Sequence, residues 1–151
     1  MKPSVTVAAV VERDGRFLLV EEQTRDGIRI NQPAGHLESG ESLVAAAARE
    51  TLEETACDFT PSHLLGVYLW RASDGVTFTR FAFVGTAGEP ETGRSLDDGI
   101  VRAFWLTPDE LRARVAEHRS PLVMRCVDDY LRGQRFPLDS IYTHPNVWQP
   151  A

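Results

Sequence analysis

The sequence predicts an α/β/α sandwich, in which a mixed β-sheet carries helices on both faces. Short apolar runs rich in β-branched residues occur in pairs around turn signals, which is the pattern of β-hairpins. Helix-start signals lie between and after these pairs, so strands and helices alternate along the chain. At 151 residues with 42% hydrophobic content, the chain can bury one sizeable core and gives no reason to expect a second domain.

Four strand-like runs predict two hairpins in the order of the chain. Each pair encloses a short segment with glycine and aspartate, the residues that tolerate the left-handed backbone of tight turns. The first hairpin combines residues 5–11 with 17–21 around Asp14-Gly15, and the second combines residues 64–70 with 76–85 around Ser73-Asp74-Gly75.

Between the hairpins, the sequence predicts a turn followed by an acidic helix. Residues 31–36 are turn-forming, because Pro33 stiffens the segment and Gly35 permits a close approach that a side chain would forbid. Ser39 or Gly40 can cap the helix, and an acid near its first turn complements the helix dipole. An apolar stripe should lie opposite the acidic face, formed by Val44, Ala48 and Leu52.

The C-terminal third predicts a loop, a strand and two helices. Residues 86–99 are rich in glycine, proline and acids, so we expect an exposed loop. Residues 100–106 have the composition of a strand. The run Thr107-Pro108-Asp109-Glu110 opens a helix with an N-cap, a proline at the first position and a capping-box glutamate. Ser120-Pro121 opens the next helix, which Gly133 ends.

The most informative spacing in the chain ends in three glutamates on the acidic helix. Glu50, Glu53 and Glu54 are three and four residues apart, so they share one face. Like charges at this spacing repel by about 0.2–0.5 kcal/mol per pair. A divalent cation reverses that sign, and Mg²⁺ takes hard oxygen ligands while leaving positions for water and phosphate oxygens. The cluster suits phosphate-ester or pyrophosphate chemistry, whereas the simpler alternative is a solvated helix face.

These residues match the signature of the Nudix hydrolases, Gly-x5-Glu-x7-Arg-Glu-U-x-Glu-Glu-x-Gly-U, in which U is apolar. The positions in register are Gly35, Glu41, Arg49, Glu50, Glu53 and Glu54. The chain departs from the pattern at Thr51, Ala56 and Cys57, none of which is a charged position. Because Ala56 stands where a helix would end on a left-handed glycine, its departure affects the helix terminus more than the metal site.

Within that family, further stretches resemble the NudJ-type phosphatases, and this resemblance spans nearly the whole chain. The stretches are residues 5–8, 31–38, 119–123 and 133–138. The subgroup resemblance implies a broad nucleoside tri- and diphosphatase that also acts on the pyrophosphate of a thiamine precursor. We therefore expect residues 1–151 to form one Nudix hydrolase domain that cleaves phosphoanhydride bonds of small phosphorylated substrates.

The family resemblance also implies a metal site. We expect Mg²⁺, with Mn²⁺ as the alternative ion, to be held by Glu50, Glu53 and Glu54, with a backbone carbonyl from Gly35. A bound metal would activate a water and clamp phosphate oxygens. The ligands Glu50, Glu53 and Glu54 thus count among the catalytic residues.

Other residues of the motif have supporting roles by resemblance. Arg49 is implied to hold a catalytic glutamate in position, although we expect its side chain on a different helix face from Glu53-Glu54. Glu41 would support the site from behind the ligands. The general base stays open at this point, with Glu50, Asp97 and Asp98 as the candidates.

Residues that bind the rest of the substrate are harder to identify. The only lysine is Lys2, so an arginine must supply any other cationic contact to phosphate, and Arg80 is our first candidate. The alternative for Arg80 is a solvated strand residue. His36 is expected to be a loop residue rather than a catalytic one. Several aromatic residues could stack a base, but their alternation in strands favours a place in the core: Tyr68, Trp70, Phe78, Phe81 and Phe83.

Composition argues against several other classes of protein. The net charge of −6 is opposite to the basic surface that binding to a nucleic-acid polymer requires. Cys57 and Cys126 form no C-x-x-C motif, and the four histidines lack zinc-site spacing. The apolar run at residues 5–11 is too short to span a membrane and lacks the features of a secretory signal, so we expect a cytoplasmic monomer or homodimer.

Two alternatives on the same fold remain. A non-hydrolytic nucleotide-binding or regulatory module would have no need of the repulsive cluster Glu50, Glu53 and Glu54. A prenyl-diphosphate isomerase would need further catalytic residues, typically a reactive cysteine, which Cys57 at a helix end does not obviously supply. A DNA glycosylase is disfavoured by the acidic charge balance.

Overall fold

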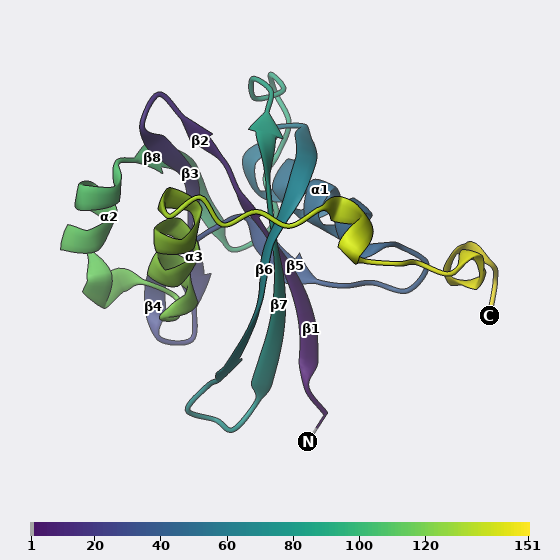
Figure 1. Cartoon of the computed structure of the whole chain (residues 1–151). Coiled ribbons are helices and arrows are strands. Elements are labelled where there is room, and N and C mark those ends of the chain that lie inside the picture. Colours follow the sequence, from purple (N-terminus) through teal and green to yellow (C-terminus); the bar gives the residue numbers. More distant parts are fainter. Residues whose placement is uncertain (1) are drawn as a thin grey trace.

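The structure, a computed structural model, describes residues 2–151 and shows two β-sheets with helices on both sides (Figure 1). The first sheet has the strand order β5-β1-β7-β6 and is mixed, because β1 and β7 are parallel and the other pairs are antiparallel. In the second sheet, β3 pairs with β2, β4 and β8, all antiparallel. The strands are β1 Ser4–Val10, β2 Glu12–Arg13, β3 Arg16–Thr24, β4 Gly27–Asn31, β5 Ala34–His36, β6 Phe59–Arg71, β7 Thr77–Ala87 and β8 Ile100–Leu106.

Helix α1 (Leu43–Thr55) covers one side of the strands, and α2 (Pro108–Ala113) and α3 (Leu122–Leu131) cover the other (Figure 1). Alternation along β1 separates the two cores, because successive side chains point to opposite faces. Val7 and Ala9 pack with α1, whereas Ala8 and Val10 pack with α2 and α3. The predicted α/β/α arrangement with a mixed sheet is therefore confirmed, and its strands divide between two sheets.

The prediction that residues 5–11 pair with residues 17–21 in a hairpin is wrong. Strand β1 does not pair with β3 but lies between β5 and β7. The turn at Asp14-Gly15 joins the short β2 to β3 instead, and both turn residues have positive φ, 52° and 80°. The break after Val10 moves the chain from one sheet to the other, which strand composition cannot indicate. The second hairpin, β6 with β7, is confirmed and is longer than predicted.

The segment before the acidic helix is a strand as well as a turn. Residues Ala34, Gly35 and His36 form β5 and pair with β1, so Gly35 is fixed beside α1. The helix begins later than expected, because Ser42 rather than Ser39 or Gly40 is the N-cap. The Oγ atom of Ser42 accepts a hydrogen bond from the backbone N–H of Ala45 at 3.1 Å.

The buried face of α1 also differs from the prediction. Val44 packs partly buried against the core beside α1, but Ala48 and Leu52 belong to neither core cluster, so the predicted apolar stripe is largely wrong. The most buried positions are instead Ala46, Ala47, Glu50, Thr51, Glu54 and Thr55. Helix α1 thus turns part of its acidic face towards the strands. This arrangement is costly for isolated charges and calls for a chemical reason.

The C-terminal third matches the predictions closely. Strand β8 has the predicted bounds, and the capping box of Thr107 and Glu110 opens α2. Gly133 follows α3 with a φ of 82°. Within residues 2–151, three short 3-10 helices lie at Val115–Glu117, Leu138–Ser140 and Pro145–Trp148. Among residues 2–151, no helix combines the length and the apolar character that a membrane crossing requires.

Candidate active site

A cavity of about 670 Å³ opens between α1, β5, the β6–β7 hairpin and the start of α3. Its volume lies within the range typical of small-molecule sites. Its wall carries carboxylates from α1, aromatic rings from the β6–β7 hairpin, and arginines from several elements. The lining residues include Glu22, Glu50 and Glu54, Trp70 and Phe78, and Arg25, Arg80 and Arg119.

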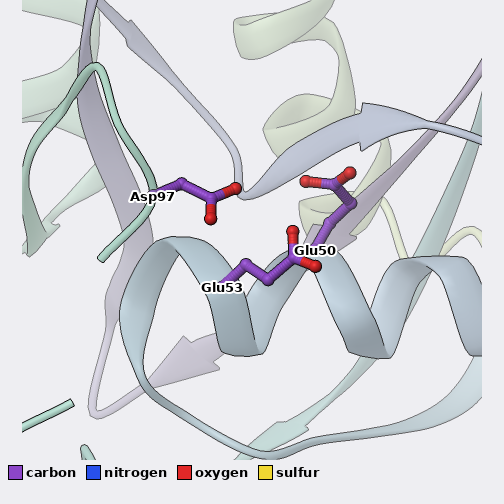
Figure 2. A group of neighbouring side chains, drawn as sticks. All are labelled: Glu50, Glu53 and Asp97. Carbon is purple, nitrogen blue, oxygen red and sulfur yellow. The ribbon is translucent and has the colours of Figure 1, made fainter. Parts of the chain in front are cut away.

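Three carboxylates converge at the edge of this cavity (Figure 2). Glu50, Glu53 and Asp97 each offer one oxygen, and these oxygens lie within 4.8 Å of one another. We call these three residues the carboxylate group. Glu50 and Glu53 are one turn apart on α1, whereas Asp97 comes from the loop at residues 88–99. That loop is fixed beside the helix, because the N–H of Asp97 donates to the carbonyl of Glu53 at 2.9 Å.

Arg49 connects the carboxylates of this region. Its Nε and Nη2 atoms donate to Glu41 at 2.9 and 2.7 Å, and its Nη1 atom donates to Glu50 at 2.9 Å and to Glu53 at 3.3 Å. Nη2 also donates to the carbonyl oxygen of His36 at 3.0 Å. The expectation that Arg49 lies on a different face from Glu53 is wrong, because residues four apart on a helix are neighbours.

Glu41 and Gly35 each have a local structural reason for their identity. The hydrogen bond from Arg49 lowers the pKa of Glu41 and keeps its carboxylate ionised. At Gly35, an added Cβ would lie 2.1 Å from the carboxyl carbon of Glu50, so a larger residue would push this side chain away. Glycine at this position therefore makes room for the buried Glu50.

Glu50 and Glu54 are both buried acids. Burial raises the pKa of Glu50 despite its contact with Arg49. Burial also raises the pKa of Glu54 to about 9, although Glu54 accepts a hydrogen bond from the N–H of Ala34 at 3.0 Å. Glu54 faces Glu22 across the cavity wall and lies outside the carboxylate group. Glu22 was absent from the predicted site residues, because an acid at the end of an apolar strand gives no signal of its own.

Arg80 is buried rather than solvated, which excludes the alternative considered from sequence. Only 6% of the residue is exposed, and it lines the inner part of the cavity. Its Nη1 and Nη2 atoms donate to the side-chain oxygens of Gln32 and Asn31, both at 2.9 Å. Both of these partners are neutral amides.

The aromatic residues of the hairpin divide between core and cavity. Tyr68 and Phe83 are buried in the two cores, as the sequence favoured. Trp70 and Phe78 line the cavity instead, so their predicted core position is wrong. His36 lies on strand β5 rather than in a loop, and its ring is 6.4 Å from that of Phe78.

The two aspartates considered as bases lie in different places relative to the glutamates of α1. Asp97 joins Glu50 and Glu53, whereas Asp98 lies outside the carboxylate group, and both aspartates are exposed. Among residues 2–151, Arg49 is the one cation that pairs with Glu50 and Glu53, and it is shared with Glu41, so the site carries excess negative charge. Clustered carboxylate oxygens are the donor type that Mg²⁺ and Mn²⁺ prefer. The residues present therefore fit a hard divalent cation.

Comparisons with known proteins agree with this geometry. The NUDIX domain model matches residues 1–126. Phosphatase NudJ of Escherichia coli (strain K12) is 41% identical over 140 residues, which cover 93% of this chain and 91% of that protein. The solved structure of a NUDIX hydrolase from Nitrosomonas europaea is 52% identical, covers 95% of this chain and 98% of the other, and superposes with a TM-score of 0.92. A MutT NUDIX hydrolase from Burkholderia pseudomallei shares the fold at 22% identity, with a TM-score of 0.72 and coverages of 85% and 98%.

Proposed function

This chain belongs to the NUDIX domain family and is an enzyme of the Nudix hydrolase type, and from that premise we propose that it hydrolyses phosphoanhydride bonds with Mg²⁺. The proposed substrates are nucleoside di- and triphosphates or related small diphosphates, including thiamine-type pyrophosphates. The observation that carries the proposal is the carboxylate group beside the cavity, since Glu50 belongs to both. Mn²⁺ is expected to substitute for Mg²⁺.

Glu50, Glu53 and Asp97 would hold the cation through their clustered oxygens. We keep Glu54 and the carbonyl of Gly35 as further ligand candidates, because both line the same cavity. A bound Mg²⁺ would supply charge neutralisation for phosphate oxygens and a water of lowered pKa. Two protein features position these ligands: Arg49 ties Glu50 to Glu53, and Asp97 is anchored by its backbone bond to α1.

The reaction requires a proton acceptor on the protein. The oxygen of an attacking water bonds to phosphorus, the bridging P–O bond breaks, and a carboxylate takes the proton of the water. Glu50 and Asp97 are the candidates for this role, because both belong to the carboxylate group and Asp98 does not. Glu41 contributes indirectly, because its carboxylate accepts hydrogen bonds from Arg49 and so fixes the position of the guanidinium group.

A substrate screen with the purified chain tests the proposal. Nucleoside tri- and diphosphates, nucleotide sugars, dinucleoside polyphosphates and thiamine-type pyrophosphates are incubated with Mg²⁺, with Mn²⁺, or with a chelator. We expect release of phosphate or pyrophosphate that depends on the added metal. Hydrolysis in ¹⁸O-labelled water then identifies which phosphorus is attacked. Turnover that is equal with chelator and with Mg²⁺ would contradict a metal-dependent mechanism, and no turnover of any compound would favour a binding module.

A further inference from the structure

Arg80 is a buried cation whose contacts are all with neutral groups. Its Nη1 and Nη2 atoms donate to the amide oxygens of Gln32 and Asn31, both at 2.9 Å. Nη1 also donates to the Sγ atom of Cys126 at 3.9 Å, and burial raises the pKa of this thiol, so it stays protonated. Among residues 2–151, none of the contacts of Arg80 is with an acid, although buried charges are ordinarily paired.

The other arginines of the cavity wall are in a different state. Arg25 pairs with Asp74 at 3.4 Å, and Arg119 pairs with Glu22 at 3.3 Å. Their side chains are 82% and 44% exposed, so water also screens their charges. Arg80 therefore offers the cavity a positive charge that neither an acid nor bulk water cancels.

The two amides that hold Arg80 are themselves fixed from behind. Gln32 is 1% exposed, and its Nε2 atom donates to the carbonyl oxygen of Val123 on α3 at 2.8 Å. Asn31 is 8% exposed, and its Nδ2 atom donates to Glu22 at 3.4 Å. Each amide thus presents its oxygen to a different Nη atom, and two such acceptors fix the plane of a guanidinium group. An aspartate or glutamate in either place would fix the same plane but would cancel the charge.

The register of the mixed sheet connects Arg80 to the carboxylate group. Arg80 on β7 lies beside Thr6 on β1, and Thr6 lies beside His36 on β5. The next residue of β5 is Gly35, whose backbone packs against the carboxyl group of Glu50. Arg80 and Glu50 line one cavity, so a substrate with a phosphate at the carboxylate group can place another anionic group against Arg80.

We propose that Asn31 and Gln32 are positioning residues, which hold Arg80 in one orientation with its charge uncancelled so that it binds a phosphate group of the substrate. Arg80 contacts the phosphate, and the two amides act through Arg80. This inference rests on the proposed function and adds to it the residues that set the affinity for phosphate. Amide side chains suit these positions because they accept hydrogen bonds from Arg80 without competing with the substrate for its charge.

The first test replaces an amide by the acid of the same shape. Asn31→Asp keeps an acceptor for Arg80 but adds a carboxylate, and we expect KM for a hydrolysed diphosphate to rise about 10- to 150-fold, the equivalent of one charge-assisted hydrogen bond. The value of kcat should change little, because the carboxylate group is untouched. Gln23→Glu is the matched control, an exposed amide-to-acid change on β3 outside the cavity wall, and its KM should stay within about twofold of wild type. If Asn31 had only a structural role, Asn31→Asp would leave KM unchanged, since the hydrogen bond to Arg80 is retained.

The second test asks whether Asn31 acts through Arg80. Asn31→Ala removes the acceptor without adding a charge, and it should raise KM in the wild-type background. In the Arg80→Gln background the same change should cause no further rise, because no guanidinium is left to position. Rises in KM that multiply in the double variant overturn the proposal. Thermal unfolding of each variant shows whether it is folded, and this cycle decides the question if Asn31→Asp fails to fold.

Calorimetric binding of methylenediphosphonate, a diphosphate analogue that cannot be cleaved at the bridging position, keeps the two proposals distinguishable. It is titrated with Mg²⁺ and with a chelator. If the wild-type protein binds the analogue, Asn31→Asp weakens binding, and no compound is hydrolysed, then the positioning role stands and the proposed hydrolysis fails. If hydrolysis depends on Mg²⁺ but binding is the same in Asn31→Asp and Gln23→Glu, then the positioning role fails and the hydrolysis stands. No binding to the wild-type protein under either condition also overturns the positioning role.

Discussion

Helices α1 and α3 both bury carboxylates, but the pKa of the buried carboxylate is lowered on α3 and raised on α1. On α3, Asp129 is 1% exposed and accepts hydrogen bonds from Tyr68 at 2.8 Å, from Arg125 at 3.0 Å and from Arg132. Burial alone would raise the pKa of Asp129, but these donors bring it below its ordinary value. On α1, burial dominates and raises the pKa of Glu50 and Glu54.

The difference separates a fully compensated carboxylate from an acidic cluster that keeps excess negative charge. Two guanidinium groups surround the single carboxylate of Asp129, so nothing further is needed to compensate it. Around α1, Arg49 is shared between several acids, and Glu54 has the N–H of Ala34 as its donor. An incompletely compensated acidic cluster beside a cavity is where an added cation gains the most.

The largest expected effect is the loss of activity when an acid of the carboxylate group is replaced. Glu53→Gln and Asp97→Asn each remove one charge from the carboxylate group. We expect kcat/KM to fall about 100-fold or more in each variant. Replacing a residue that only hydrogen-bonds to a metal ligand already lowers activity about 10- to 100-fold, and replacing a ligand should cost more. Asp98→Asn should have little effect, because Asp98 lies outside the group. Steady-state kinetics at several Mg²⁺ concentrations measure this. Glu89→Gln, an exposed change in the same loop, controls for the loss of charge alone.

Equal activity in Asp97→Asn and Asp98→Asn would contradict the proposed role of the carboxylate group. It would mean that the position of Asp97 beside Glu53 has no part in the reaction. A Tm unchanged from wild type in Glu53→Gln shows that any loss of activity is not a loss of folding.

A substitution at Asp129 on α3 should lower the stability of the protein and leave its activity unchanged. Asp129→Asn removes the charge that Arg125 and Arg132 share, and we expect the free energy of unfolding to fall by about 1.5–3 kcal/mol. The loss is limited because both arginine side chains are largely exposed and can return to water. Asp128→Asn is the matched control, because its exposed pair with Arg112 should contribute less than about 1 kcal/mol. Urea unfolding measures both, and the Mg²⁺ dependence of activity should stay unchanged.

The two helices should also show opposite pH dependence. In the unfolded chain Glu54 ionises near its ordinary value of 4.5, whereas in the metal-free folded protein its pKa is about 9. Glu54 therefore stays protonated to a higher pH in the folded protein than in the unfolded chain. Its contribution to the free energy of unfolding is full below pH 4.5 and is lost as the pH rises towards 9. Asp129 has a lowered pKa, so its contribution is present above its ordinary value of 3.8 and is lost as pH falls below it.

Thermal unfolding with a chelator tests this dependence for Glu54. Each tenfold change in an acid dissociation constant is worth about 1.4 kcal/mol, or roughly 3–6 °C in Tm for a chain of this size. Glu54→Gln should raise Tm relative to wild type more at pH 8.5 than at pH 5, because glutamine cannot ionise. Added Mg²⁺ should narrow that difference at pH 8.5. A difference in Tm that is the same at both pH values would contradict the raised pKa.

Sequence spacing brought together two of the three acids in the carboxylate group but could not indicate the third. Helix geometry is local, so the spacing on α1 predicts that Glu50 and Glu53 lie together, but Glu54 lies outside the carboxylate group. Asp97 enters the group through a backbone bond to Glu53 from more than forty residues away, and composition had offered it only as a candidate base.

The misassigned aromatic residues and the buried face of α1 have a related cause. Alternation in a strand separates two faces but does not say how far a helix covers each, so Trp70 and Phe78 could not be distinguished from core residues. Periodicity likewise assigns charged residues to the outside of a helix, which fails for buried acids such as Glu50. By contrast, Thr107 and Gly133 were predicted correctly, because caps depend on neighbouring residues alone.

The smallest expected effect concerns how the two helices end. Gly133 follows α3 in the left-handed region at no steric cost, whereas α1 ends on Ala56 with a φ of 63°. A non-glycine residue there costs about 1–2 kcal/mol, but the Ala56 methyl group is buried and contributes in the opposite direction. Ala56→Gly should therefore raise the free energy of unfolding by about 0.5–1 kcal/mol, and Gly133→Ala should lower it by a similar amount. If Ala56→Gly instead destabilises the protein, the packing of this methyl group outweighs the backbone strain, and α1 ends on alanine for the sake of its core.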